Sequence, residues 1–333
     1  MSASITLPQG VQLCHLPTRF PLQHGGELVG GSLAYERQGP ADAPLVVVLG
    51  GISAGRHVSA HDRAPAPGFW DGLVGPGAAI DTRRCQVLAF DWLGGAGCST
   101  APAAGEACEA FPFVAAEDQA RALWHLVDAL ALGRVHALVG SSYGGMVALH
   151  AAAQQPQRVR RLAAIAAAHR SHPQASAWRK VQRDVVELGL RAGSPQEALA
   201  VARALALCTY RTPGELLERF GGAPGFRDGD VIYPVQEWLA ARGSAFAAEW
   251  TAEQFLCLNR SIDAHCLAPS TVTVPTWLLA FVGDQLVPPS EVRELALQLP
   301  DLRAHRELRS RYGHDAFLKE PRYVSTFLQE VLS

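Results

Sequence analysis

The chain has 333 residues, of which 48% are hydrophobic and 18% are charged, and its formal net charge is −2. This composition is typical of a globular protein with a large core, and the near-neutral charge gives no reason to expect nucleic acid or an anionic membrane as a partner. No uninterrupted apolar stretch reaches the ~18 residues of a membrane span, and residues 1–12 lack the basic-then-apolar order of a signal peptide. Seven scattered cysteines without a C-x-x-C pair are typical of reduced thiols. We therefore expect a cytoplasmic protein.

Strands and helices alternate along most of the chain. Apolar runs predict strands at residues 32–36, 45–49, 87–90, 135–139, 162–168, 274–282 and 305–308. Helices are predicted between them at 113–132, 147–155 and 290–298, with a closing helix at 321–332. This alternation is typical of a mostly parallel sheet with helices on both faces.

One segment interrupts the alternation. Residues 171–268 contain only predicted helices, at 178–190, 195–208, 213–220, 235–248 and 252–263. We interpret this segment as a helical lid inserted over the carboxyl edge of the sheet, with residues 1–170 and 269–333 forming the core.

The sequence Gly140-Ser141-Ser142-Tyr143-Gly144 lies between a predicted strand and a predicted helix. In that context the pattern G-x-S-x-G predicts a nucleophile elbow, a sharp turn that exposes a serine hydroxyl to a cleft. Ser142 is the predicted nucleophile, and the N–H of Tyr143 would point the same way, toward an oxyanion. The alternative is a Gly/Ser turn that carries no chemistry.

Two further regions match the partners that a serine nucleophile needs. A glycine pair follows strand 45–49, and the backbone N–H groups of Gly51 and Ile52 are candidates for the second oxyanion donor, although a plain strand-to-helix turn has the same signature. Asp284 ends a strand after the lid, and His314 lies in the loop after the last strand. The order Ser, Asp, His is that of an α/β-hydrolase triad, with His314 as base and Asp284 orienting its ring.

A metal site is not expected. The spacing of His57 and His61 could suggest a metal-binding pair, but no acidic residue or cysteine is spaced with them in the sequence.

Several longer stretches resemble the homoserine O-acyltransferase family of the α/β-hydrolase superfamily. The similar stretches are residues 70–77 with 80–82, 142–146, Arg203 with 209–211, 255–258 with Asp263, 283–289 and 312–318. Two departures lie near the expected acyl pocket. Tyr143 stands where the family usually has methionine, and residues 91–96 replace the family's Asn-x-Leu-Gly-x-Cys stretch.

The resemblance implies acyl transfer from acyl-CoA, as a co-substrate, to the hydroxyl of L-homoserine in methionine biosynthesis. No bound cofactor is expected. The protein is expected to form a homodimer through the lid. By the same resemblance Arg203 binds the carboxylate of the acceptor and Asp315 its ammonium group, with Tyr210 as a further pocket residue. Acyl-CoA is expected across the mouth of the site, near the basic lid residues Arg179, Lys180 and Arg183.

The acyl group is predicted from the turn after Gly51. Arg56 lies close in sequence to the oxyanion donors, and a succinyl group carries a terminal carboxylate that needs a cation once water is excluded. Arg56, with Ser53 as a second donor, therefore favours a succinyl over an acetyl donor, unless Arg56 pairs at the surface. Three alternatives stay open: an enzyme that uses L-serine as acceptor, an esterase, and a binding module without catalysis.

Overall fold

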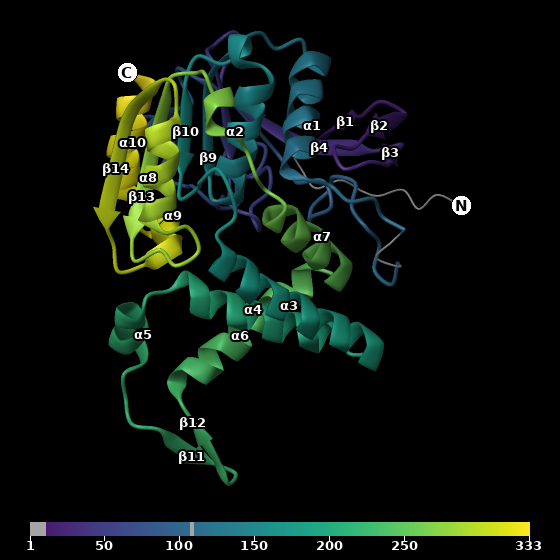
Figure 1. Cartoon of the computed structure of the whole chain (residues 1–333), viewed down its shortest axis with the longest axis vertical. Helices are drawn as coiled ribbons and strands as arrows, with labels where there is room; N and C mark the ends of the chain where they lie inside the picture. Colours follow the sequence, from purple (N-terminus) through teal and green to yellow (C-terminus); the bar gives the residue numbers. More distant parts are fainter. Residues whose placement is uncertain (1–10, 107–109) are drawn as a thin grey trace.

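A single sheet of eight strands, in the order β1-β4-β8-β5-β9-β10-β13-β14, organises the fold (Figure 1). The computed structural model describes residues 11–106 and 110–333, so Cys108 and most of the N-terminal segment in which no signal peptide is predicted lie outside the described residues. Strand β4 pairs antiparallel with β1 and β8, and the remaining neighbours are parallel. The strands are β1 (Gln12–His15), β4 (Ser32–Gln38), β5 (Leu45–Leu49), β8 (Gln86–Phe90), β9 (Val135–Ser141), β10 (Leu162–Ile165), β13 (Thr276–Val282) and β14 (Leu302–Arg309).

Helices cover both faces of this sheet. Strand β5 is buried along its whole length, and its side chains alternate between two hydrophobic clusters. Val47 and Leu49 belong to the cluster of α1 (Ala116–Ala129), α2 (Tyr143–Gln154) and α8 (Pro289–Gln298). Val46 and Val48 belong to the cluster of α10 (Pro321–Leu332). The predicted α/β-hydrolase architecture is confirmed.

The segment expected as a lid contains five helices and lies beyond the end of the sheet toward which β13 and β14 point (Figure 1). Helix α4 packs between α3 and α6. A proline occupies the first turn of α3, α4, α5 and α6, where its fixed φ suits a helix start and its missing N–H costs nothing. The bounds are α3 (Pro173–Ala192), α4 (Pro195–Tyr210), α5 (Pro213–Phe220), α6 (Pro234–Glu249) and α7 (Ala252–Asp263).

Several short elements were not predicted from the sequence. An exposed hairpin, β11 (Gly225–Arg227) and β12 (Asp230–Ile232), extends from the lid, and Asp228 and Gly229 turn it with φ of +52° and +84°. Strand β1 and the pairs β2 (Arg19–Pro21) with β3 (Glu27–Val29) and β6 (Val74–Gly75) with β7 (Ile80–Asp81) were also missed. Within residues 11–106 and 110–333, no helix is both long enough and apolar enough to span a bilayer.

Candidate active site

Ser142 occupies a strained turn between β9 and α2. Its φ of +54° and ψ of −123° lie outside the regions that non-glycine residues ordinarily adopt. A Cβ on Gly140 would lie 2.2 Å from the Gly144 carbonyl oxygen, and one on Gly144 would lie 2.3 Å from the Leu49 carbonyl oxygen. Only glycine fits at either position, which is the physical reason for the two glycines of the G-x-S-x-G pattern.

The structure brings Ser142, His314 and Asp284 together in a buried chain of hydrogen bonds. The distance from Ser142 Oγ to His314 Nε2 is 2.8 Å, and that from His314 Nδ1 to Asp284 Oδ2 is 2.6 Å. The other carboxylate oxygen of Asp284 accepts hydrogen bonds from the backbone N–H groups of Leu286 (2.8 Å) and Val287 (2.9 Å), which fix its orientation. This arrangement matches the roles of nucleophile, base and orienting acid.

The charge of Asp284 sets the basicity of His314. Burial by itself lowers the pKa of the His314 imidazole, but the negative charge of Asp284 and its hydrogen bond more than offset this, so the pKa is raised above its ordinary value. A base with a raised pKa accepts the serine proton more readily and can return it to a leaving group.

Backbone donors for an oxyanion face the same place. A Cβ on Gly51 would lie 3.8 Å from Ser142 Cβ, so the turn after β5 passes directly beside the nucleophile. Within the described part of the chain, the N–H groups of Gly51, Ile52 and Tyr143 donate no hydrogen bond. The indole N–H of Trp92 holds the Gly51 carbonyl at 3.2 Å and so fixes the orientation of this turn. All three predicted N–H groups are therefore available to a substrate oxygen.

The side chain of Tyr143 contacts both the core and the lid. Its hydroxyl lies 2.7 Å from Ser261 Oγ, and its ring packs edge-on against Trp92 with centroids 5.0 Å apart. The tyrosine that replaces the family's usual methionine therefore ties the elbow to helix α7.

A largely apolar cavity opens between the oxyanion turn and the lid. Ile52 and Ser53 line it from the core, and Arg203, Tyr210 and Phe246 line it from helices α4 and α6. The Arg203 guanidinium lies 4.7 Å from the Phe246 ring centroid and 5.4 Å from that of Tyr210. Among the described residues Arg203 has no carboxylate partner. It is a cation held in place by aromatic faces, with its hydrogen-bond donors unused.

Two more predicted residues lie beside the base. The Tyr210 ring centroid is 5.9 Å from that of His314, and Asp315 follows His314 directly. The Asp315 carboxylate forms an ion pair with the Arg211 guanidinium at 2.9 Å, and Arg211 also pairs with Glu215 at 2.7 Å. Burial raises the pKa of Asp315, and the charges of Arg211, His314 and Arg203 oppose that rise. The partnership of Arg211 with Asp315 was not predicted from the sequence.

The expectation for Arg56 is corrected by its position. Its backbone N–H donates to Asp91 at 2.8 Å, its guanidinium pairs with the same carboxylate, and its Nε lies 3.3 Å from Glu36. Arg56 is also absent from the described residues that line the cavity. Its charge is neutralised by two buried carboxylates, so it is not a free cation for an acyl group. Ser53 does line the cavity, and its role as a donor stays a prediction.

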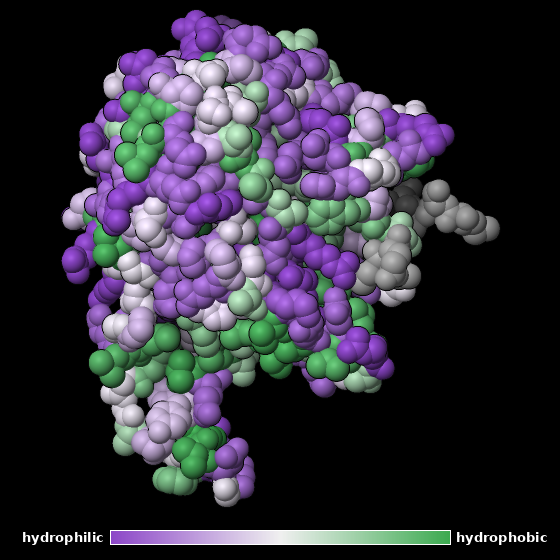
Figure 2. All heavy atoms as spheres, viewed as in Figure 1, coloured by the Kyte–Doolittle hydropathy of each residue, from purple (hydrophilic) through white to green (hydrophobic). Residues whose placement is uncertain are grey.

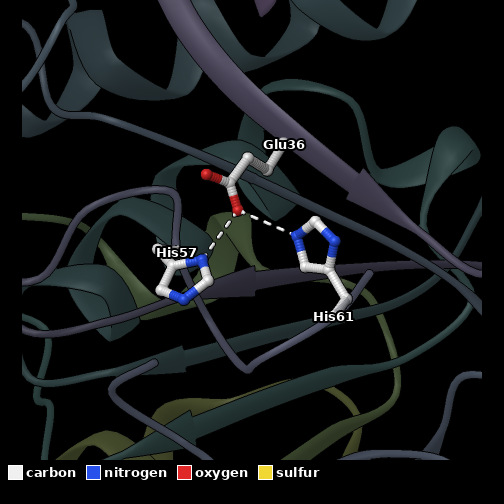
Figure 3. A group of neighbouring side chains, drawn as sticks. All are labelled: Glu36, His57 and His61. Atoms are coloured by element: carbon white, nitrogen blue, oxygen red, sulfur yellow. Dashed lines mark hydrogen bonds and ion pairs between the residues drawn. The ribbon is translucent and has the colours of Figure 1, made fainter. Parts of the chain in front are cut away.

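The reasoning about His57 and His61 was incomplete, because strand β4 supplies an acidic partner. Glu36 Oε2 lies 2.9 Å from His57 Nδ1 and 3.3 Å from His61 Nε2 (Figure 3). The ligand atoms of these three residues lie within 4.8 Å of one another, so they could hold a cation. This carboxylate also pairs with Arg56, and both ring nitrogens of His57 face acceptors, Glu36 and the Ala66 carbonyl. The cluster is satisfied as a hydrogen-bonded ion network, and the absence of a bound metal stays a prediction.

The basic lid residues expected near acyl-CoA lie in two settings. Arg179 and Arg183 both pair with Asp263 inside the lid, whereas Lys180 is exposed and pairs with Asp184. Of these three residues, only Arg179 lines the cavity.

Comparisons with known proteins agree with this geometry. A family model described as the alpha/beta hydrolase fold matches residues 44–194. A homoserine O-succinyltransferase from Xanthomonas campestris is 40% identical over 95% of this chain and 83% of its own length. A homoserine O-acetyltransferase from Thermobifida fusca is 32% identical over 94% of this chain and 91% of its own length.

Solved structures confirm the fold. A homoserine O-acetyltransferase from Bacillus anthracis superposes with a TM-score of 0.87, covering 98% of both chains at 18% sequence identity. At that identity the likeness speaks for the fold alone. The sequence similarity over nearly the whole chain goes further, and the protein belongs to the homoserine O-acyltransferase family of α/β-hydrolase enzymes.

Proposed function

We propose that this enzyme transfers a succinyl group from succinyl-CoA to the hydroxyl of L-homoserine through an acyl-serine intermediate. The observation that carries the proposal is the unpaired Arg203 guanidinium, which lines a cavity next to a Ser–His–Asp array. A plain esterase has no need of a cation there, whereas an amino-acid acceptor brings a carboxylate that does. The Xanthomonas relative, named a homoserine O-succinyltransferase, supports the choice of acyl group.

The first half-reaction acylates the enzyme. Ser142 Oγ attacks the thioester carbonyl carbon while His314 Nε2 takes the hydroxyl proton, across the present 2.8 Å hydrogen bond. The N–H groups of Tyr143 and of Gly51 or Ile52 stabilise the resulting oxyanion. The C–S bond then breaks, and His314 returns the proton to the CoA thiolate.

The second half-reaction reverses these roles with a different alcohol. Arg203 binds the carboxylate of homoserine, Asp315 its ammonium group, and Tyr210 packs beside the base. His314 takes the proton of the homoserine hydroxyl, whose oxygen attacks the acyl-serine, and the proton then returns to Ser142 Oγ. Water must be kept out at this stage, which gives the lid its purpose.

Product analysis tests this proposal. The purified enzyme is given succinyl-CoA or acetyl-CoA with L-homoserine, L-serine or no acceptor, and products are identified by mass spectrometry. We expect O-succinylhomoserine to form fastest. Faster formation of O-acetylhomoserine would overturn the choice of donor. Faster acylation of serine would overturn the choice of acceptor. Release of CoA at the same rate with and without an acceptor would indicate an esterase.

We further propose that the protein works as a homodimer formed through the lid. Hydrophobic side chains gather over the lid (Figure 2), and Val201, Leu217 and Phe226 are 57%, 73% and 79% exposed. Analytical ultracentrifugation of wild type and Val201→Asp checks this, because a charge on this exposed apolar surface of the lid should yield monomers. A monomeric wild type would refute it.

We also place the enzyme in the cytoplasm, acting in methionine biosynthesis without a bound cofactor. Cys14, Cys85, Cys98, Cys208 and Cys266 are free thiols among the described residues, which supports a reducing compartment. Fractionation of cells producing the protein tests the location, and recovery of the enzyme outside the cytoplasm would contradict it.

A further inference from the structure

Two arginines inside the lid share a single carboxylate. Arg179 Nε lies 2.6 Å from Asp263 Oδ1, and an Nη1 N–H of Arg183 donates to Asp263 Oδ2. The three side chains are 10%, 14% and 17% exposed, and neither arginine has another ion pair among the described residues. The group therefore carries a net charge of about +1 in a setting where uncompensated charge is costly. A buried surplus cation of this kind indicates a binding site for an anion.

Arg179 directs its unused donors toward the reaction site. It lines the cavity that reaches Ile52 and Ser53 of the oxyanion turn. It also lines a second, smaller cavity that reaches His314. Its Nε is bound to Asp263 and its Nη2 to Ser171 and Ser176, but its Nη1 has no hydrogen-bond partner among the described residues. Arg183 lines neither cavity and instead binds Asn259 and Asp263.

The charges of the substrates leave one group without a partner. Homoserine is a zwitterion, and Arg203 supplies a positive charge for its carboxylate. Asp315 supplies a negative charge for its ammonium group, because the Arg211 that pairs with Asp315 is shared with Glu215. A succinyl group on Ser142 carries a second carboxylate, two methylene groups beyond the ester carbonyl. Arg56 is already neutralised by Asp91 and Glu36, so Arg179 is the lining cation that is left for this carboxylate.

We propose that Arg179 binds the distal carboxylate of the succinyl group and so sets the preference for a dicarboxylic acyl donor. This inference rests on the proposed function, since an acetyl group has no carboxylate to bind. Asp263, Ser171 and Ser176 hold the guanidinium from behind, which keeps its free edge aimed into the cavity. Succinyl-CoA is therefore recognised by a positioned charge-assisted hydrogen bond, and a neutral acyl group of the same length is not.

The experiment compares succinyl-CoA with butyryl-CoA, a neutral donor with the same number of acyl carbons. In a ping-pong reaction, kcat/KM for the donor reports enzyme acylation and kcat/KM for homoserine reports transfer. We expect Arg179→Gln to lower the succinyl-to-butyryl ratio of kcat/KM at least about tenfold, equivalent to about 1.4 kcal/mol. Arg179→Lys, which keeps the charge but loses the planar fork, should recover part of the ratio.

Arg183→Gln is the matched control, because it removes the other arginine of the cluster, which does not itself line the cavity. Asp263 keeps one arginine partner in either variant, so both lids retain a neutral ion pair, and circular dichroism checks their folding. An unchanged ratio in Arg179→Gln would overturn the inference, as would an equal fall in Arg183→Gln. If Arg179→Gln fails to fold, a ratio in Arg179→Lys equal to that of wild type overturns it instead. A wild type that prefers acetyl-CoA would refute the proposed donor, which is a different result from a succinyl-specific enzyme that is indifferent to Arg179.

Discussion

Replacing Arg203 by alanine should separate recognition of the acceptor from acylation of the enzyme. The guanidinium is half-buried, rests on Phe246 and Tyr210, and has no carboxylate partner among the described residues. Removing one side of a charge-assisted pair costs about 2–5 kcal/mol, with the upper end belonging to fully buried pairs. A half-buried residue should lie near about 2–3 kcal/mol, which corresponds to a loss of roughly 30- to 150-fold.

The assay measures both specificity constants of the ping-pong reaction. In Arg203→Ala, kcat/KM for homoserine should fall by that factor, whereas kcat/KM for succinyl-CoA should change by less than about threefold, well under 1.4 kcal/mol. In Arg203→Lys, kcat/KM for homoserine should lie between the values for wild type and Arg203→Ala, because lysine keeps the charge but not the bidentate fork. Arg242→Ala is the control. Arg242 and Arg203 both line a second cleft, beside Arg211 and Asp315, but Arg242 does not line the cavity that reaches the oxyanion turn. A fall in kcat/KM for succinyl-CoA, with no change in kcat/KM for homoserine, would place Arg203 on the donor side and refute the reasoning.

Three further outcomes follow from the geometry of the site. His314 must be neutral to accept a proton, and the charge and hydrogen bond of Asp284 raise its pKa. The acid limb of kcat/KM for the donor should therefore lie at higher pH than for an ordinary histidine and move to lower pH in Asp284→Asn; a limb that stays in place would contradict this. Gly144→Ala should lower the free energy of unfolding in urea by about 1–3 kcal/mol and abolish activity, because the added Cβ would meet backbone oxygens. The control Gly133→Ala should leave both unchanged, because its Cβ would meet no atom within 4 Å. Dialysis against EDTA should leave activity and melting temperature unchanged, and a loss restored by Zn²⁺ would show that Glu36, His57 and His61 hold a metal.

The nucleophile, base and acid were predictable because each depends on a local signal. The strand–Gly-x-Ser-x-Gly–helix order fixes the turn around Ser142, and Asp284 and His314 each follow a strand of the same parallel sheet. The carboxyl ends of such strands meet at one edge, so the order along the chain was enough to place the three residues together.

Side-chain direction was not predictable in the same way. Arg56 is adjacent in sequence to the oxyanion turn, but its partners come from two other parts of the fold, the middle of β4 and the end of β8. Strands β4 and β8 pair antiparallel, which brings Glu36 and Asp91 to one place although they are far apart in the chain. His57 and His61 lie in the segment after β5, and their acidic partner Glu36 lies on β4, a contact that the spacing of residues in the sequence does not show.

The lid shows a second limit of prediction from the sequence. Its helices were predictable from proline starts and apolar spacing, but the hairpin β11–β12 is short and exposed, so no apolar alternation marks it. Its Asp228-Gly229 turn was the available signal. The pairing of Arg211 with Asp315 and of Arg179 with Asp263 depends on how the lid docks on the core and on itself, which no local pattern reports.

Intact-mass spectrometry of the acyl-enzyme tests the central claim most directly. Wild-type enzyme mixed with succinyl-CoA in the absence of acceptor should gain the mass of one succinyl group, and peptide mapping should place it on Ser142. Ser142→Ala should gain nothing, and adding L-homoserine to the wild-type adduct should discharge it and yield O-succinylhomoserine. An enzyme that turns over succinyl-CoA and homoserine without forming any adduct, or whose adduct forms on another residue, would contradict the account.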